Sequence, residues 1–117
     1  MMTQSIKIQD IVNELDLDVL TGTDLKRSIS GGYASDLLSC VIAGAQPDNV
    51  WVTLQAHPNV IAVASLANLA AVIITEGVTP DEQTVQKARE QEICLLTTPK
   101  TTFTVVGELS ALGIGGS

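Results

Sequence analysis

Polar side chains that could hold a ligand gather at four places in this sequence. The four segments are residues 31–36, 53–57, 75–80 and 97–102, and each follows a predicted strand and precedes a predicted helix. In open parallel sheets, ligands bind where the carboxyl ends of strands meet the amino ends of helices. The candidate ligand-binding residues in these segments are Gly31, Gly32, Tyr33, Ser35, Asp36, Thr53, Gln55, His57, Thr75, Glu76, Thr97, Thr98, Lys100, Thr101 and Thr102.

The fourth segment has the chemistry of an anion site. Free backbone N–H groups at a helix start, threonine hydroxyls and the ammonium group of Lys100 all favour a phosphate or a carboxylate. Threonine and proline are also the ordinary residues for capping and starting a helix. Helix capping without any ligand is therefore the competing interpretation of this segment.

The glycine pair in the first segment also has two interpretations. One is a turn from strand to helix with positive φ, which glycine adopts at low cost. The other is a close approach of the backbone to a ligand or a neighbouring subunit, with Tyr33 as a lid and Ser35 and Asp36 as polar contacts. The pair does not form a G-x-G-x-x-G loop, and the G-x-x-x-x-G-K-[ST] phosphate loop is absent from the sequence.

Catalytic constellations are not recognisable. His57 is the only histidine, and it stands before Pro58, where a capping role is more typical than catalysis. No spacing assembles a nucleophile–base or acid–base pair from Asp36, His57, Glu76 and Lys100. We therefore predict a protein without enzymatic activity and without a cofactor.

The two cysteines do not indicate a metal site. Cys40 lies in an apolar helical pattern and Cys94 in an apolar strand pattern, so both are predicted to be buried, reduced thiols. A metal site requires clustered cysteine and histidine ligands. We predict no metal.

Composition restricts the partners. The 117 residues include 13 acidic and six basic side chains, with a net charge of −7, which argues against nucleic acid and anionic membranes. Only 16% of the residues are charged, which favours a homodimer or a higher homo-oligomer. Neither a signal peptide nor an apolar stretch long enough to span a bilayer is recognisable, so we expect a cytoplasmic protein.

Hydrophobic periodicity predicts alternating strands and helices. Strands are expected over residues 17–20, 26–30, 50–54, 70–75 and 93–96, and helices over residues 6–15, 35–45, 59–68, 80–91 and 102–112. Ser35 or Asp36 is predicted to cap the second helix and Thr79 the fourth. The third helix is apolar on nearly every side, and a subunit interface could supply its second cover.

The pattern as a whole predicts a single α/β domain spanning residues 1–117. Its layered fold has a mostly parallel sheet flanked by helices, a core over about residues 5–113, and a flexible tail at residues 114–117.

Several segments together resemble the DRTGG domain family. The resemblance rests on Gly31-Gly-Tyr-Ala-Ser-Asp-Leu-Leu-Ser39, on Val50-Trp-Val-Thr-Leu-Gln55 with His57, and on Ala71-Val-Ile-Ile-Thr75, and it covers about residues 5–113. The family implies an α/β module that stands alone or is attached to other domains, as in some phosphotransacetylases and CBS-containing pyrophosphatases. It is also similar to the N-terminal domain of HPr kinase/phosphorylase.

The resemblance implies a regulatory module, and it does not imply a kinase. The phosphate-binding loop of HPr kinase/phosphorylase belongs to a separate domain that has no counterpart in this chain. The family motif Asp-Arg-Thr-Gly-Gly corresponds here to Ser28-Ile-Ser-Gly-Gly32, so its aspartate and arginine are missing. The leading hypothesis is a ligand-sensing module for a nucleotide or phosphate-containing molecule. The alternative is a structural or protein-interaction subunit without a small-molecule ligand.

Overall fold

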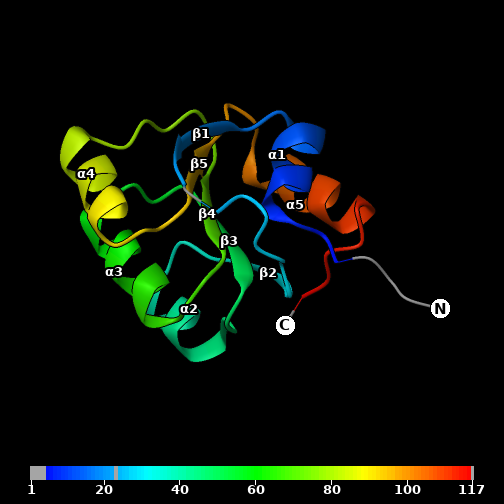
Figure 1. Ribbon diagram of the computed structural model, residues 1–117, viewed down its shortest axis with the longest axis horizontal. Helices are drawn as coiled ribbons and strands as arrows, with labels where there is room; N and C mark the ends of the chain where they lie inside the picture. Colours follow the sequence, from blue (N-terminus) through cyan, green and yellow to red (C-terminus); the bar gives the residue numbers. More distant parts are fainter. Residues whose placement is uncertain (1–4, 23, 117) are drawn as a thin grey trace.

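The computed structural model of this protein describes residues 5–22 and 24–116. From β2 onward strands and helices alternate along the chain, as the hydrophobic pattern predicts (Figure 1). The elements are α1 (Ile8–Leu15), β1 (Asp18–Thr21), β2 (Gly31–Ala34), α2 (Leu38–Gly44), β3 (Asn49–Thr53), α3 (Pro58–Leu66), β4 (Ala71–Ile74), α4 (Glu82–Glu90), β5 (Leu95–Thr97) and α5 (Thr102–Ala111).

The five strands form one mixed sheet in the order β1-β5-β4-β3-β2. Strands β2, β3, β4 and β5 pair in parallel with their neighbours, whereas β1 pairs antiparallel with β5 at one edge. This arrangement confirms the predicted α/β fold with a mostly parallel sheet. It also places the carboxyl ends of four strands along the same edge of the sheet.

Helices cover both faces of the sheet. Figure 1 shows α2, α3 and α4 on one side and α1 and α5 on the other. Each face has its own buried cluster. Val50, Val52 and Ile73 point toward α1 and α5, whereas Trp51 and Val72 point toward the three other helices. Trp51, which lies within the predicted strand over residues 50–54, is completely buried. Strands buried on both faces explain the continuous apolar runs in the sequence.

Most of the apolar surface of α3 is covered within the chain. Val60, Ile61 and Ala64 are completely buried, and α3 packs beside both α2 and α4. Leu66 at the end of the helix is 75% exposed. Neighbouring helices of the same chain therefore supply most of the second cover for which the sequence suggested a subunit interface.

The prediction for β2 was wrong in position. The strand begins at Gly31 instead of ending there, and residues 26–30 do not join the sheet. Ile29 donates its N–H to the carbonyl of Ile6, so this segment pairs with the N-terminal part of the chain. Gly31 and Gly32 pair with the first two residues of β3, and the positive-φ turn predicted for the glycine pair does not exist.

Two helix starts also differ from the prediction. The N-cap of α2 is Leu37, because Ser35 and Asp36 use their side chains in loop hydrogen bonds. The N-cap of α4 is Asp81 instead of Thr79, and its carboxylate accepts a hydrogen bond from the N–H of Thr84. Asp81 thus makes the capping hydrogen bond two residues after Thr79, whereas Leu37 at the start of α2 makes no side-chain cap.

The prediction of a buried Cys40 was wrong, whereas Cys94 is buried as expected. Cys40 lies on α2, where Val41 is the one residue that is buried. Neighbouring residues on a helix point in different directions, so the apolar run around Cys40 does not place every member in the core.

The C-terminal segment runs beside β2. The sequence predicts a flexible tail from residue 114, but Ile114 is buried and the carbonyl of Gly115 accepts a 2.8 Å hydrogen bond from the N–H of Gly32. Gly116 also forms a parallel bridge with Gly32. Residue 117 lies outside the described residues. The segment therefore covers part of the free edge of β2.

No helix within residues 5–22 and 24–116 has both the length and the apolar character needed to cross a membrane.

A candidate ligand site at the carboxyl edge of the sheet

Most of the predicted ligand-binding segments meet at one edge of the sheet. Strands β2 to β5 run in parallel and end at Ala34, Thr53, Ile74 and Thr97, so the loops that follow them lie next to one another. The glycine pair is the exception, because it starts β2 and lies toward the opposite edge of the sheet. The structure thus separates the glycines from the polar residues that follow them.

Asp36 joins the first two loops. One of its carboxylate oxygens, Oδ1, accepts hydrogen bonds from the hydroxyl of Thr53 and from the N–H of Leu54, both at 2.8 Å. Gln55 donates its side-chain amide to the carbonyl of Asp36 at 3.2 Å, and its backbone N–H donates to the Thr53 hydroxyl. The nearby carbonyl of Ser35 accepts a hydrogen bond from the indole of Trp51. These candidate ligand contacts are used to hold the loops together.

A second network joins the end of β4 to the start of α5. The hydroxyls of Thr75 and Thr102 are 2.7 Å apart and share a hydrogen bond. Glu76 accepts a 2.7 Å hydrogen bond from the N–H of Thr102 through Oε2, and its own N–H donates to the carbonyl of Lys100. A carboxylate is favourable at a helix N-terminus because the helix dipole is positive there. The position that an external anion would occupy is therefore taken by Glu76.

Lys100 points away from the strand ends. Its ammonium group donates to the carbonyl of Leu15 at 2.9 Å and forms an ion pair with Glu108 at 2.9 Å. The cation that sequence analysis assigned to a phosphate thus links the end of α1 to α5. Its role as a phosphate ligand remains a prediction that would require this ion pair to open.

Three other predicted residues stabilise their own loops. His57 caps α3 by accepting the N–H of Asn59 at Nδ1, which agrees with the capping interpretation. Thr101 caps α5 by accepting the N–H of Thr104, and the Thr98 hydroxyl accepts the N–H of Lys100. Close by, hydrogen bonds from Thr84 lower the pKa of the Asp81 carboxyl, the N-cap of α4.

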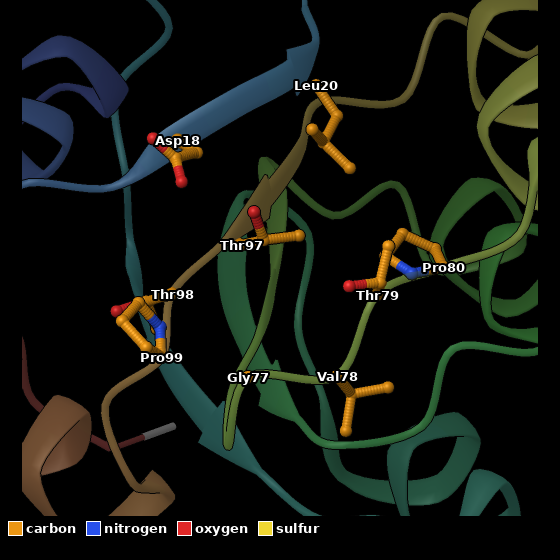
Figure 2. Close-up of a pocket in the computed structure, with 9 residues that line it drawn as sticks. All are labelled: Asp18, Leu20, Gly77, Val78, Thr79, Pro80, Thr97, Thr98 and Pro99. Carbon is orange, nitrogen blue, oxygen red and sulfur yellow. The ribbon is translucent and has the colours of Figure 1, made fainter.

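A cavity of about 230 Å³, which we call the carboxyl-edge pocket, opens beside these networks (Figure 2). It lies between β1, the loop after β4 and the end of β5. Its lining residues are Asp18, Leu20, Gly77, Val78, Thr79, Pro80, Thr97, Thr98 and Pro99. Thr97 and Thr98 are the two candidate ligand-binding residues from the sequence that line it.

Three polar side chains in this pocket have no partner among the described residues. The hydroxyls of Thr79 and Thr97 make no hydrogen bond to another described residue, and the Asp18 carboxylate forms neither a hydrogen bond nor an ion pair with one. In the two neighbouring networks, by contrast, every threonine hydroxyl takes part in a hydrogen bond. The unused groups are available to a bound molecule.

Asp18 and Leu20, which form one wall of the pocket, are not among the residues predicted from the sequence. Both belong to β1, and the antiparallel pairing of β1 with β5 places Asp18 opposite Thr97. A local pattern predicts the strand but not its pairing partner, so no signal in the sequence brought Asp18 to the carboxyl edge. Thr79 and Pro80 were in a predicted junction but were assigned to helix capping.

A second cavity, of about 210 Å³, lies along the edge strand β2, beside α5. It is lined by Gly32 and Tyr33 of β2 together with parts of α5 and the C-terminal segment. The phenol ring of Tyr33 lies against Gly44, where an added Cβ would be only 2.7 Å from the Tyr33 hydroxyl oxygen. Gly32 and Tyr33 are therefore separated from the carboxyl-edge pocket.

The arrangement at the carboxyl edge is suited to binding. Asp18 is the one ionisable side chain that lines the pocket, so an acid–base pair is lacking among its described lining residues. Within the described ranges, no group of three or more His, Cys, Asp or Glu side chains is arranged to hold a metal ion. Hydroxyls, one carboxylate and apolar walls are the groups that this site offers.

The fold and the site define a three-layer α/β domain with a small pocket at the carboxyl edge of its sheet. The family model of the DRTGG domain matches residues 10–112, and the chain belongs to this family. No curated protein matches the sequence significantly.

A solved structure shows the same fold. It contains the CBS and DRTGG domains of the regulatory region of Clostridium perfringens pyrophosphatase, in complex with the activator diadenosine tetraphosphate. The TM-score is 0.74 at 15% sequence identity, and the match covers 88% of this chain and 45% of that one. The present chain therefore spans less than half of the length of that regulatory region.

Proposed function

We propose that this protein is a non-enzymatic regulatory module that binds a nucleotide or a related phosphate-containing small molecule in the carboxyl-edge pocket. The observation that carries the proposal is the group of unpartnered polar side chains, Asp18, Thr79 and Thr97, which converge on a pocket at the expected edge of a parallel sheet. The neighbouring loops have their hydroxyls satisfied, so this pocket stands out as the place where hydrogen-bonding capacity remains unused.

The family supports a regulatory role. In the Clostridium perfringens pyrophosphatase, a DRTGG domain is part of a regulatory region whose activator is a dinucleotide. By analogy, the present domain senses a nucleotide and passes the signal on through a partner chain or another copy of itself. Its acidic surface, with a net charge of −7, suits a basic partner surface.

Thermal unfolding with a panel of nucleosides, nucleotides and phosphate esters tests the proposal. A ligand at tenfold excess over its Kd stabilises the folded state by about 1.4 kcal/mol. For a domain of this size that corresponds to a rise in Tm of about 5 °C. If no compound at millimolar concentration changes the Tm, the proposed function is wrong.

Two matched variants locate the binding site. Thr79→Trp fills the carboxyl-edge pocket from an exposed position, whereas Ser110→Trp places the same side chain in the second cavity. We expect Thr79→Trp to abolish the ligand-induced shift and Ser110→Trp to leave it intact. If instead Ser110→Trp abolishes the shift and Thr79→Trp leaves it intact, the ligand binds in the second cavity.

A second function is favoured by one observation on α5. Phe103, the only phenylalanine in the sequence, is 90% exposed, and Val106 one turn later is 39% exposed. Large apolar side chains on one exposed helix face are typical of an interface. The domain would then act as a homo-oligomerising subunit. Light scattering on the native protein and on Phe103→Ser tests this role, which requires an oligomer that the substitution dissociates.

A further inference from the structure

We propose that the carboxyl-edge pocket binds the uncharged nucleoside end of its ligand and leaves any phosphates in solvent. This inference rests on the proposed function and specifies which part of a nucleotide is recognised. It follows from the charges around the pocket, the nature of its walls and its size.

The charges around the pocket disfavour a phosphate. The ionisable side chain that lines it is the carboxylate of Asp18, and neither lysine nor arginine belongs to its described lining. Lys100, which follows the lining residue Pro99, is directed to Glu108 and to the carbonyl of Leu15. A phosphate in the pocket would face a negative charge without a compensating cation.

The other feature that attracts phosphates, a helix N-terminus, is already occupied. The carboxylate of Glu76 accepts the N–H of Thr102, and the hydroxyl of Thr101 accepts the N–H of Thr104. Both bonds use backbone donors of the first turn of α5. A phosphate could reach these donors only by displacing groups of the protein itself.

The walls suit a flat ring. Figure 2 shows Pro80 and Pro99 on opposite sides of the pocket, with Leu20 and Val78 between them at either end. These rigid apolar side chains can hold a nucleobase by its faces. Thr79 and Thr97 can exchange hydrogen bonds with the polar edge of the base.

The position of Asp18 suits binding of the sugar of a nucleoside. A carboxylate accepts hydrogen bonds from the two hydroxyls of a ribose, as acidic residues do in dinucleotide-binding folds. A volume of about 230 Å³ lies below the range of roughly 300–1,000 Å³ that is usual for sites holding a complete drug-sized ligand. The pocket therefore has room for a base with its sugar, and not for a dinucleotide.

Isothermal titration calorimetry with matched compounds tests the inference. The compounds are adenosine, guanosine, cytidine and uridine, each compared with its 5′-monophosphate and 5′-triphosphate at two salt concentrations. For the base that binds, we expect the nucleoside to bind at least as tightly as its phosphorylated forms. The affinity of the nucleoside should change little with salt because no charge is paired on binding.

Two aspartate variants provide the control. Asp18→Asn removes the charge at the pocket, and we expect the triphosphate to gain roughly threefold to tenfold in affinity relative to the nucleoside. Asp16→Asn removes the same charge nearby, at a residue outside the pocket lining, and asparagine tolerates its positive φ of 55°. We expect Asp16→Asn to change this ratio much less than Asp18→Asn does.

The possible outcomes separate the inference from the proposed function. If affinity rises with each phosphate and falls steeply with salt, the inference is wrong and the proposed function stands. Equal effects of the two aspartate variants would also overturn it. If neither nucleosides nor nucleotides bind, the inference is wrong, and the proposed function then depends on whether a phosphate ester raises the Tm in the thermal-unfolding panel.

Discussion

Removing the hydroxyl of Thr75 is expected to destabilise the fold without weakening ligand binding. Thr75 is completely buried at the end of β4, and its hydroxyl pairs with that of Thr102 at 2.7 Å. In Thr75→Val a methyl group of similar size replaces the hydroxyl, so the change leaves little cavity. It removes the hydrogen bond with Thr102 and a longer one, of 3.4 Å, that the Thr75 hydroxyl donates to the carbonyl of Thr53. Thr75 does not line the carboxyl-edge pocket, although the sequence suggested it as a ligand contact.

The expected magnitude follows from the burial of the two hydroxyls. One hydrogen bond contributes about 0.5–1.5 kcal/mol net, and a buried group left without a partner costs about 1–3 kcal/mol. Thr102 is half-buried, so water can partly replace its lost partner. We therefore expect Thr75→Val to lower the free energy of unfolding by about 1.5 kcal/mol. With an m-value of about 1.5 kcal/mol/M, the urea midpoint falls by about 1 M.

A double-mutant cycle in urea isolates the pair. Thr102→Val alone should cost a similar amount, and the double variant should cost about 1 kcal/mol less than the sum of the two. Thr79→Val is the control, because the exposed Thr79 hydroxyl has no partner among the described residues, and we expect a change within about 0.5 kcal/mol. If the cost of the double variant equals the sum of the two single costs within about 0.3 kcal/mol, the two hydroxyls do not interact and the reasoning is refuted. A large loss of ligand affinity in Thr75→Val would restore its role as a contact.

Two further predictions concern stability. Burial raises the pKa of the Cys94 thiol from 9.0 to about 11, so Cys94 contributes almost no pH dependence below about pH 8. Between about pH 8 and 11 the thiol ionises in the unfolded chain before it ionises in the folded one, and the free energy of unfolding falls by up to about 1.4 kcal/mol per pH unit. In urea unfolding, the difference in this free energy between the native protein and Cys94→Ala should therefore change with pH only in this range. Gly44→Ala should lower stability, because the added Cβ would lie 2.7 Å from the Tyr33 hydroxyl oxygen. In a Tyr33→Ala background the same change should stabilise by roughly 0.5–1 kcal/mol, and equal effects in both backgrounds would contradict the clash.

Local signals in the sequence were sufficient to predict the order of the helices and strands. They also predicted the edge of the sheet at which a ligand site could form. Apolar strands of four or five residues, prolines at helix starts and threonine caps act over a few residues, so they can be interpreted without knowledge of the partner strand. The parallel run from β2 to β5 follows from the helices between the strands. The capping role of His57 was predicted on the same basis.

Contacts between distant segments decided which residues line the carboxyl-edge pocket. Lys100 bonds to the carbonyl of Leu15, 85 residues away, which withdraws the cation that the sequence offered to a phosphate. Asp18 reaches the pocket because β1 pairs antiparallel with β5. The glycine pair lies in β2, where the N–H of Gly32 donates to the carbonyl of Gly115. Its neighbour is therefore the C-terminal segment of the same chain, which neither interpretation of the sequence named.

There is a physical reason why the sequence predicted the elements but not all the residues that line the pocket. Helix periodicity and capping depend on residues three or four positions apart, so the sequence by itself determined the elements and their order. Strand pairing and ion pairing depend on which distant groups the packed layers bring within hydrogen-bond range. Only the tertiary structure could therefore decide which polar side chains are consumed in holding the fold together and which remain free to bind a ligand.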